Sequence, residues 1–264
     1  MVEFEMKRSQ QYIEVVRMTL KIYLKDFRIL VTLCFVFMLP IILAYKIPDY
    51  LIELVRNSET FHDIIVWPNL IEFIVIFRYL AIFLTFDIIS AEYHNSTILP
   101  LTVNPISRHR LILGRFFTYC FLLFLIESIA YLILVMITNS GYEFQILNSV
   151  IWVGYFSLIM ANVITLSISI LLSVLIKKPI NSLILHLLFI FIAEPIVERF
   201  KESEYLSISH NVESIINIFQ EDIKNNTFHY SIAIIIPFFP FLIISSGILM
   251  LCILSFKFLD IKSN

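Results

Sequence analysis

The chain has very little glycine, little charge and few cysteines, and each shortage excludes a class of protein. Only four of its 264 residues are glycine, and none of them begins a GxxxxGK[ST] phosphate-binding loop. That loop needs glycines so that backbone amides can approach the phosphates, so we expect no P-loop ATPase on this chain. The three cysteines all lie in apolar runs, so no disulfide framework is predicted.

Motifs of membrane-embedded hydrolases are missing as well. The sequence contains no HExxH, no GxSG serine and no pair of aspartates within its apolar runs. The six histidines are scattered over loops and apolar runs, and those that share a loop lack the spacing of metal ligands. We therefore expect no enzyme, no catalytic residue, no metal and no cofactor on this chain.

Apolar residues dominate what is present. They make up 59% of the chain and charged residues only 15%, against roughly 45–50% and about 25% in soluble domains. A membrane-spanning helix needs about 20 mostly apolar residues. The sequence predicts an all-α integral membrane protein, a single domain over residues 1–264. Its six transmembrane helices are predicted at roughly 29–45, 70–89, 116–138, 146–176, 181–197 and 231–258.

Lysine and arginine indicate the orientation, because cytoplasmic loops are enriched in both. With the N-terminus inside, most of the 19 lysines and arginines fall in cytoplasmic segments, and an even number of spans also places the C-terminus there. The richness in isoleucine, lysine and asparagine suggests a low-GC bacterium. The predicted location is therefore a bacterial cell membrane, crossed several times.

Irregular features are expected at the ends of some spans. Pro40 and Pro195 lie near the far ends of the first and fifth spans, where a missing helix hydrogen bond can bend or unwind the helix. An amphipathic stripe over residues 212–223, between the fifth and sixth spans, predicts an outer-surface helix or a re-entrant cap.

An amphipathic helix is predicted before the first span, within residues 9–27. Its apolar residues recur at three- and four-residue steps, and basic residues occupy the other faces. Such a basic helix is expected to lie along the inner membrane surface. The alternative is a cytosolic helix packed on a partner. The stripe consists of Ile13, Val16, Leu20, Tyr23 and Phe27.

Ionisable and polar residues inside the spans are costly, so each is a functional candidate. We hypothesise that Arg78 and Glu127, each near the middle of its span, neutralise one another. Glu72 and Asp87 lie near the ends of the second span, where their side chains can reach water. A packed or cavity-facing role is expected for His186, and a metal ligand or proton carrier is the alternative. The full set of candidates is Arg78, Glu127, Asn162, His186 and Glu194.

The segment between the second and third spans, residues 90–115, is the most informative part of the chain. It is short and polar, then continues through a proline-started, serine-containing turn into the next helix. Three arginines, Arg108, Arg110 and Arg115, lie in its last eight residues. A cytoplasmic element of this kind suits docking of a soluble partner.

This segment resembles the signature of the type-2 ABC transporter permeases. That signature has a glutamate, a Gly-Thr step, a leucine-rich turn, Pro-Ile-Ser-Arg and a closing Gly-Lys. The departures here are Ser96 for glycine, Pro100 where a helical leucine is usual, and Gly114-Arg115 for Gly-Lys. The residues that correspond to the docking part of the signature are Glu92, Ser96, Thr97, Leu101, Thr102, Pro105 and Arg108.

The resemblance implies a six-span permease with a cytoplasmic coupling helix between spans 2 and 3. It also implies a second permease copy, identical or related, and two copies of an ATP-binding subunit that carries ATP and Mg²⁺. Glu92 would anchor that subunit, while Arg108, Arg110 and Arg115 would hold the loop at the anionic inner leaflet. Membrane lipid is an expected partner and nucleic acid is not.

The function that follows is the export of a substrate, and an amphipathic peptide, toxin or drug is the leading expectation. Whether Arg78 and Glu127 are structural or line the transport path stays open. Two alternatives belong to other classes of protein. One is an intramembrane enzyme with an unrecognised site. The other is a membrane immunity or sensor protein that does not transport and that binds a peptide through the outer loop 198–229.

Overall fold

The computed structural model describes residues 11–21, 27–45, 67–95, 108–140, 149–199 and 238–258. Over these ranges the chain is helical with short turns and contains no strand, which confirms the all-α prediction. The named helices are α2 (Arg28–Tyr45), α4 (Trp67–Thr85), α5 (Ser90–His94), α7 (Arg108–Ser140), α8 (Ser149–Leu175), α9 (Pro179–Leu188), the π-helix η2 (Phe189–Ala193), α10 (Glu194–Glu198) and α13 (Phe238–Phe258).

Four helical stretches among these residues are long and apolar enough to cross a membrane. Their length and composition match those of a membrane-embedded protein. An additional apolar stretch, Leu242–Ser255 in α13, is shorter. Each of the six predicted spans contains a helix, but the crossing of all six stays a prediction. The four long stretches are Phe73–His94, His109–Leu134, Tyr155–Leu175 and Pro179–Ile196.

Two boundaries differ from the predicted ones. Helix α4 ends at Thr85, and α7 already begins at Arg108, inside the segment predicted as a cytoplasmic loop. No proline interrupts the residues after Arg108, so a helix can begin there. The predicted outer helix, 212–223, lies outside the described residues.

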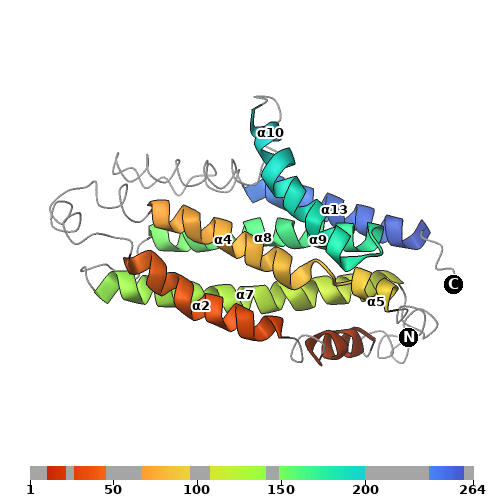
Figure 1. Ribbon diagram of the computed structural model, residues 1–264, viewed down its shortest axis with the longest axis horizontal. Coiled ribbons are helices and arrows are strands. Elements are labelled where there is room, and N and C mark those ends of the chain that lie inside the picture. Colours follow the sequence, from red (N-terminus) through yellow and green to blue (C-terminus); the bar gives the residue numbers. More distant parts are fainter. Residues whose placement is uncertain are drawn as a thin grey trace.

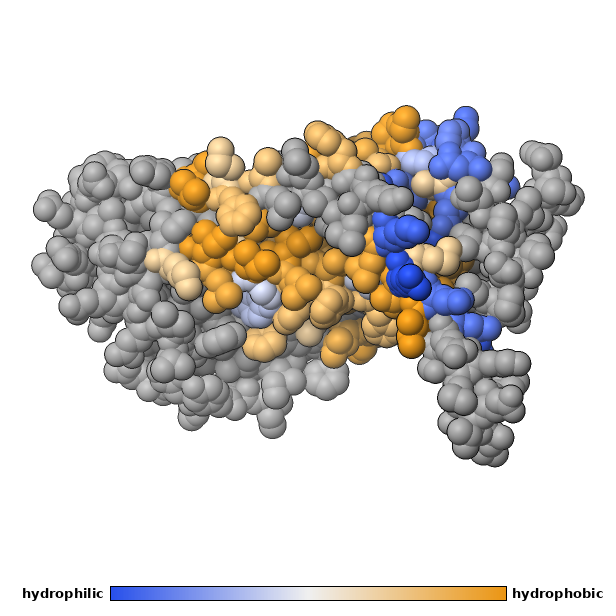
Figure 2. Space-filling view, turned by 90° about the horizontal axis from the view of Figure 1, so that it is seen from below, coloured by the Kyte–Doolittle hydropathy of each residue, from blue (hydrophilic) through white to orange (hydrophobic). Residues whose placement is uncertain are grey.

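Helix α8 is the centre of the bundle. It packs against α4, α7, α9 and α13, while α2 packs against α7 and α4. Figure 1 shows the long helices running side by side, with the start of α2, the end of α13 and helix α5 gathered at the same end. The fully buried side chains include Phe73, Phe77, Leu158 and Ile164. On the face in Figure 2, apolar residues cover the middle of the bundle and hydrophilic ones gather toward one end.

The helix of residues 11–21 lies against the first turns of α7. Its Val15 is buried beside Gly114, and Arg110 donates a hydrogen bond to the Gln11 side-chain oxygen. The buried positions are Val15 and Thr19. Ile13 of the predicted apolar stripe is exposed, and the place of this helix along the inner membrane surface stays a prediction. Because Gly114 has no side chain, Val15 can approach the backbone of α7 closely there.

The fifth predicted span has an irregular backbone next to its proline. Helix α9 widens into the π-helix η2 immediately before α10 and Pro195. Proline has no N–H and its ring collides with the carbonyl four residues earlier, here that of Phe191. A π-helical turn moves that carbonyl away, which relieves the collision. Helix α2, by contrast, continues through Pro40 to Tyr45.

The close approach at Gly114 gives a first testable prediction. A Cβ atom at this position would lie 2.7 Å from Val15 Cγ1, so Gly114→Leu should push the N-terminal helix off α7. Overpacking of this kind costs about 1–3 kcal/mol. Trypsin should then cleave faster after Arg17 and Lys21, as measured by limited proteolysis in membranes.

Gly247 provides the matched control, because nothing lies within 4 Å of a Cβ atom added there. Gly247→Leu should leave the cleavage rate unchanged, and Val15→Ala should restore part of the protection lost in Gly114→Leu. Equal cleavage of the wild type and Gly114→Leu would show that the two helices do not depend on this contact.

Candidate functional site

The second predicted span is broken near one end of the bundle. Between α4 and α5, residues 86–89 form a turn in which several regular helix hydrogen bonds are replaced. The Ile88 N–H bonds to the Thr85 carbonyl at 3.2 Å, and the Glu92 N–H bonds to the Ile89 carbonyl at 3.1 Å. In an apolar layer, each backbone group released by such a break needs a partner from the protein itself.

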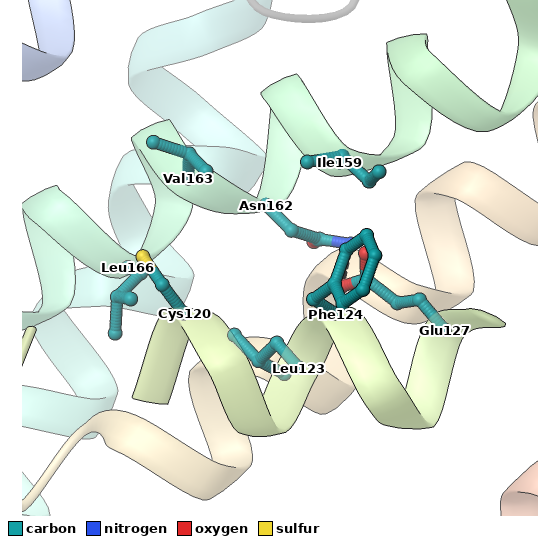
Figure 3. Close-up of a pocket in the computed structure, with 8 residues that line it drawn as sticks. All are labelled: Cys120, Leu123, Phe124, Glu127, Ile159, Asn162, Val163 and Leu166. Carbon is teal, nitrogen blue, oxygen red and sulfur yellow. Dashed lines mark hydrogen bonds between the residues drawn. The ribbon is translucent and has the colours of Figure 1, made fainter. Parts of the chain in front are cut away.

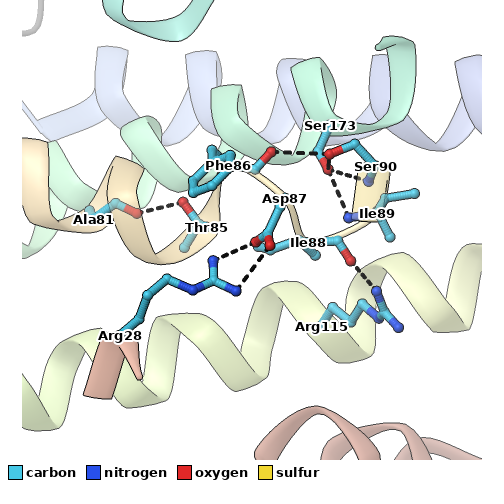
Figure 4. Close-up of polar contacts among 10 residues, drawn as sticks. All are labelled: Arg28, Ala81, Thr85, Phe86, Asp87, Ile88, Ile89, Ser90, Arg115 and Ser173. Carbon is cyan, nitrogen blue, oxygen red and sulfur yellow. Dashed lines mark hydrogen bonds and ion pairs between the residues drawn. The ribbon is translucent and has the colours of Figure 1, made fainter. Parts of the chain in front are cut away.

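Ser173 of α8 supplies one of these partners. Its hydroxyl oxygen accepts hydrogen bonds from the backbone N–H groups of Ile89 and Ser90, at 2.7 and 2.8 Å. Figure 4 shows Ser173 projecting from α8 onto the turn. The residues at this contact, Ser90 and Ser173, are fully buried. One hydroxyl therefore satisfies two backbone donors at the break.

Two arginines hold the broken segment from other helices. Arg28, at the start of α2, makes a two-pronged ion pair with Asp87 at 2.6 and 3.0 Å (Figure 4). Arg115 of α7 donates to the Ile88 carbonyl and forms an ion pair with Glu92. The break is thus fastened to α2, α7 and α8 together. Asp87 is a structural partner rather than an ordinary charge near the water.

A third ion pair is buried in the bundle and corrects the hypothesis of an Arg78–Glu127 pair. Arg78 of α4 bonds Glu194 at the start of α10, with nitrogen–oxygen distances of 2.6 and 3.3 Å. Arg78 is 4% exposed and Glu194 5% exposed. Helix α4 packs chiefly on α8 and touches both α7 and α9, and Arg78 meets the fifth span rather than Glu127.

Glu127 of α7 pairs with an amide. Asn162 of α8 donates its side-chain N–H to Glu127 at 2.7 Å, and both residues are almost completely buried. They line a small crevice of about 10 Å³, otherwise apolar, between α7 and α8 (Figure 3). That volume is close to the least that holds one water molecule, so this place suits a structural polar contact rather than a ligand site.

His186 of α9 is also buried, and its Nδ1 lies 2.8 Å from the Ser169 hydroxyl of α8. Its Nε2 has no hydrogen-bond partner among the described residues. Within the same part of the chain, no three His, Cys, Asp or Glu residues come together as metal ligands do. The position fits the packed polar role expected for His186.

The docking residues predicted from the sequence fall into two groups. Glu92 is on α5, where it is 8% exposed and bonded to Arg115. Arg108 is the first residue of α7. The others lie outside the described residues, namely Ser96, Thr97, Leu101, Thr102 and Pro105. Glu92 therefore faces its own chain, which makes it a residue that positions the segment.

Sequence reasoning missed the role of α8. Small side chains recur on this helix at every fourth position, and all are fully buried. Such a stripe lets neighbouring helices approach closely and lets hydroxyls bond across the interface. The four-residue spacing was a readable signal for Ser173 and for the partner of His186. The stripe consists of Ser157, Ala161, Thr165, Ser169 and Ser173.

In comparisons with known proteins, no family model and no curated sequence matches this chain.

The buried ion pair gives a prediction for stability. Removing one partner leaves the other charge unpaired, so Arg78→Gln and Glu194→Gln should each lower the free energy of unfolding by about 3–5 kcal/mol. The double variant should recover most of that loss, because two amides replace two charges. Denaturant unfolding in mixed micelles measures all three proteins.

Glu127 provides the comparison for this set of single and double variants. Combining Arg78→Gln with Glu127→Gln should give no recovery, since Glu127 bonds Asn162 and not Arg78. Recovery with Glu127 and none with Glu194 would favour the pairing expected from the sequence.

The hydroxyl at the break gives a separate prediction. Ser173→Ala removes the acceptor for two buried N–H groups and should destabilise the protein by about 1–3 kcal/mol. Ser246→Ala is the control, because that hydroxyl is on an exposed residue and bonds the Ile243 carbonyl of its own helix at 3.0 Å. If both variants melt like the wild type, the hydroxyl does not hold the break.

Proposed function

We propose that this chain is the membrane subunit of an ATP-driven exporter, and the broken second span carries the proposal. Helix α5 follows a turn that side chains fasten to α2 and α8, and Glu92 of α5 itself bonds Arg115 of α7. A force applied to α5 is therefore delivered to three other helices. That is what a subunit driven from outside the membrane requires.

The position of α5 supports docking of a soluble motor. It lies at the end of the bundle where α2 begins and α13 ends (Figure 1). His94 and Asn95, at its last turn, are exposed, and they lead directly into the segment that resembles the permease signature. The motor's contact surface in this proposal is thus the end of α5 with residues 96–107. Glu92 and Arg115 hold that surface in place from behind.

The division of labour follows from what the chain itself encodes. It has no phosphate-binding loop, so ATP and Mg²⁺ belong to two copies of a separate ATP-binding subunit. A second copy of this permease, or a related one, completes the path for substrate. The chain sits in a bacterial cell membrane with both termini in the cytoplasm, and the substrate is an amphipathic peptide, toxin or drug.

The test is a mild-detergent purification from native membranes, with identification of the proteins that copurify. A P-loop ATPase should accompany the wild type, and His94→Glu should reduce its recovery at least tenfold. His94 is exposed, so this substitution changes the docking surface and leaves the buried contacts intact. Arg17→Gln is the control, because it changes charge by the same amount at another exposed position.

Two results would overturn the proposal. The first is a protein that elutes alone under conditions that preserve known transporter complexes. The second is an ATPase that copurifies equally with the wild type, His94→Glu and variants of residues 96–107. In the first case, an enzyme or an immunity protein becomes the better description.

A further inference from the structure

A cavity of about 220 Å³ lies between α4 and the irregular η2–α10 segment. The Arg78–Glu194 ion pair lines its inner part, where both side chains are buried. Phe191 and Pro195 are exposed and lie at its mouth. The cavity therefore opens on the surface of this chain and ends at a pair of opposite charges.

The walls of the cavity are apolar and aromatic. The rings of Tyr79 and Phe191 stack at 5.5 Å between centroids, with 20° between their planes. Val75 and Ile190 complete the lining. Both sides of the cavity belong to long apolar stretches, Phe73–His94 and Pro179–Ile196. A ligand that reaches it from the hydrocarbon layer needs an apolar body, which these walls accommodate.

The two charges at the inner end differ in what they can exchange. A guanidinium keeps its positive charge and always needs an anion beside it in an apolar medium. A carboxyl group can instead take up a proton from water and withdraw as a neutral acid. Glu194 is thus the replaceable member of the pair, and another carboxylate can take its place on Arg78. Two parallel hydrogen bonds to a guanidinium suit any carboxylate equally well.

We propose that this cavity binds an apolar ligand carrying one carboxylate, which displaces Glu194 from Arg78. The apolar body lies against the stacked rings of Tyr79 and Phe191, and the carboxylate takes the two guanidinium hydrogen bonds. Displacement breaks the ion pair that joins α10 to α4. That this ligand class is what the exporter carries rests on the proposed function. Binding of the ligand itself needs only this chain.

A tryptophan reporter tests the binding directly. Phe191→Trp, in a chain whose Trp67 and Trp152 are replaced by phenylalanine, places one fluorophore at the mouth of the cavity. The purified protein in nanodiscs is titrated with a brominated alkyl carboxylate, the matching alcohol and the matching trimethylammonium compound. Quenching by the carboxylate should saturate, at an apparent Kd at least tenfold lower than for the other two.

The charge pair is tested in the same reporter chain. Arg78→Gln with Glu194→Gln replaces both charges with neutral amides and should abolish the tenfold preference for the carboxylate. Glu127→Gln changes a buried carboxylate outside the cavity and should preserve it. Melting temperatures close to that of the reporter chain establish that each variant is folded.

Equal quenching by all three compounds, or an unchanged preference in the double variant, would overturn the inference. Copurification of the ATPase separates this failure from failure of the proposed function. An ATPase that binds the wild type while no carboxylate preference appears removes only the ligand assignment. A carboxylate preference in a protein that elutes alone leaves the site and removes the exporter.

Discussion

Pairing of polar groups within an apolar layer is the constraint on which this structure depends. Water does not reach such groups, so hydroxyls, amides and charges there need partners from the protein itself. Among the described residues, helix α8 supplies several such partners to its neighbours from its centre in the bundle. Asn162 bonds Glu127 of α7, Ser169 bonds His186 of α9, and Ser167 bonds Ser245 of α13 at 2.8 Å. Ser173 bonds the broken second span.

Charge pairs and irregular backbone occur together in this protein. Arg28–Asp87 and Arg115–Glu92 flank the turn between α4 and α5. The Arg78–Glu194 pair joins α4 to the segment that the π-helix has displaced. An ion pair has a defined geometry, and one of its partners can be replaced by another charged group. Packed apolar side chains offer no such exchange. The places where the helices depart from regularity are therefore also the places where a ligand or partner can act on them.

The sequence indicated many of the individual residues of the site, but not which of them pair with one another. The sequence marked Arg78, Glu127, His186 and Glu194, because charge and polarity inside an apolar run stand out from the composition alone. It did not show that Arg78 faces Glu194, since either carboxylate satisfies the same electrostatic need. The choice depends on which helix lies beside α4, and helix order in a bundle follows from packing surfaces rather than from spacing along the chain.

The sequence by itself determined that the described chain is helical and apolar. It located a helix in each predicted span, although α7 begins at Arg108 and not near residue 116. Those properties follow from hydrophobic runs and from proline positions, which are local. Only the tertiary structure decided that Gly114 receives Val15, that Ser173 holds the break and that Glu92 turns inward to Arg115. Each of these contacts joins segments far apart in the chain. Their geometry exists only once the helices have packed.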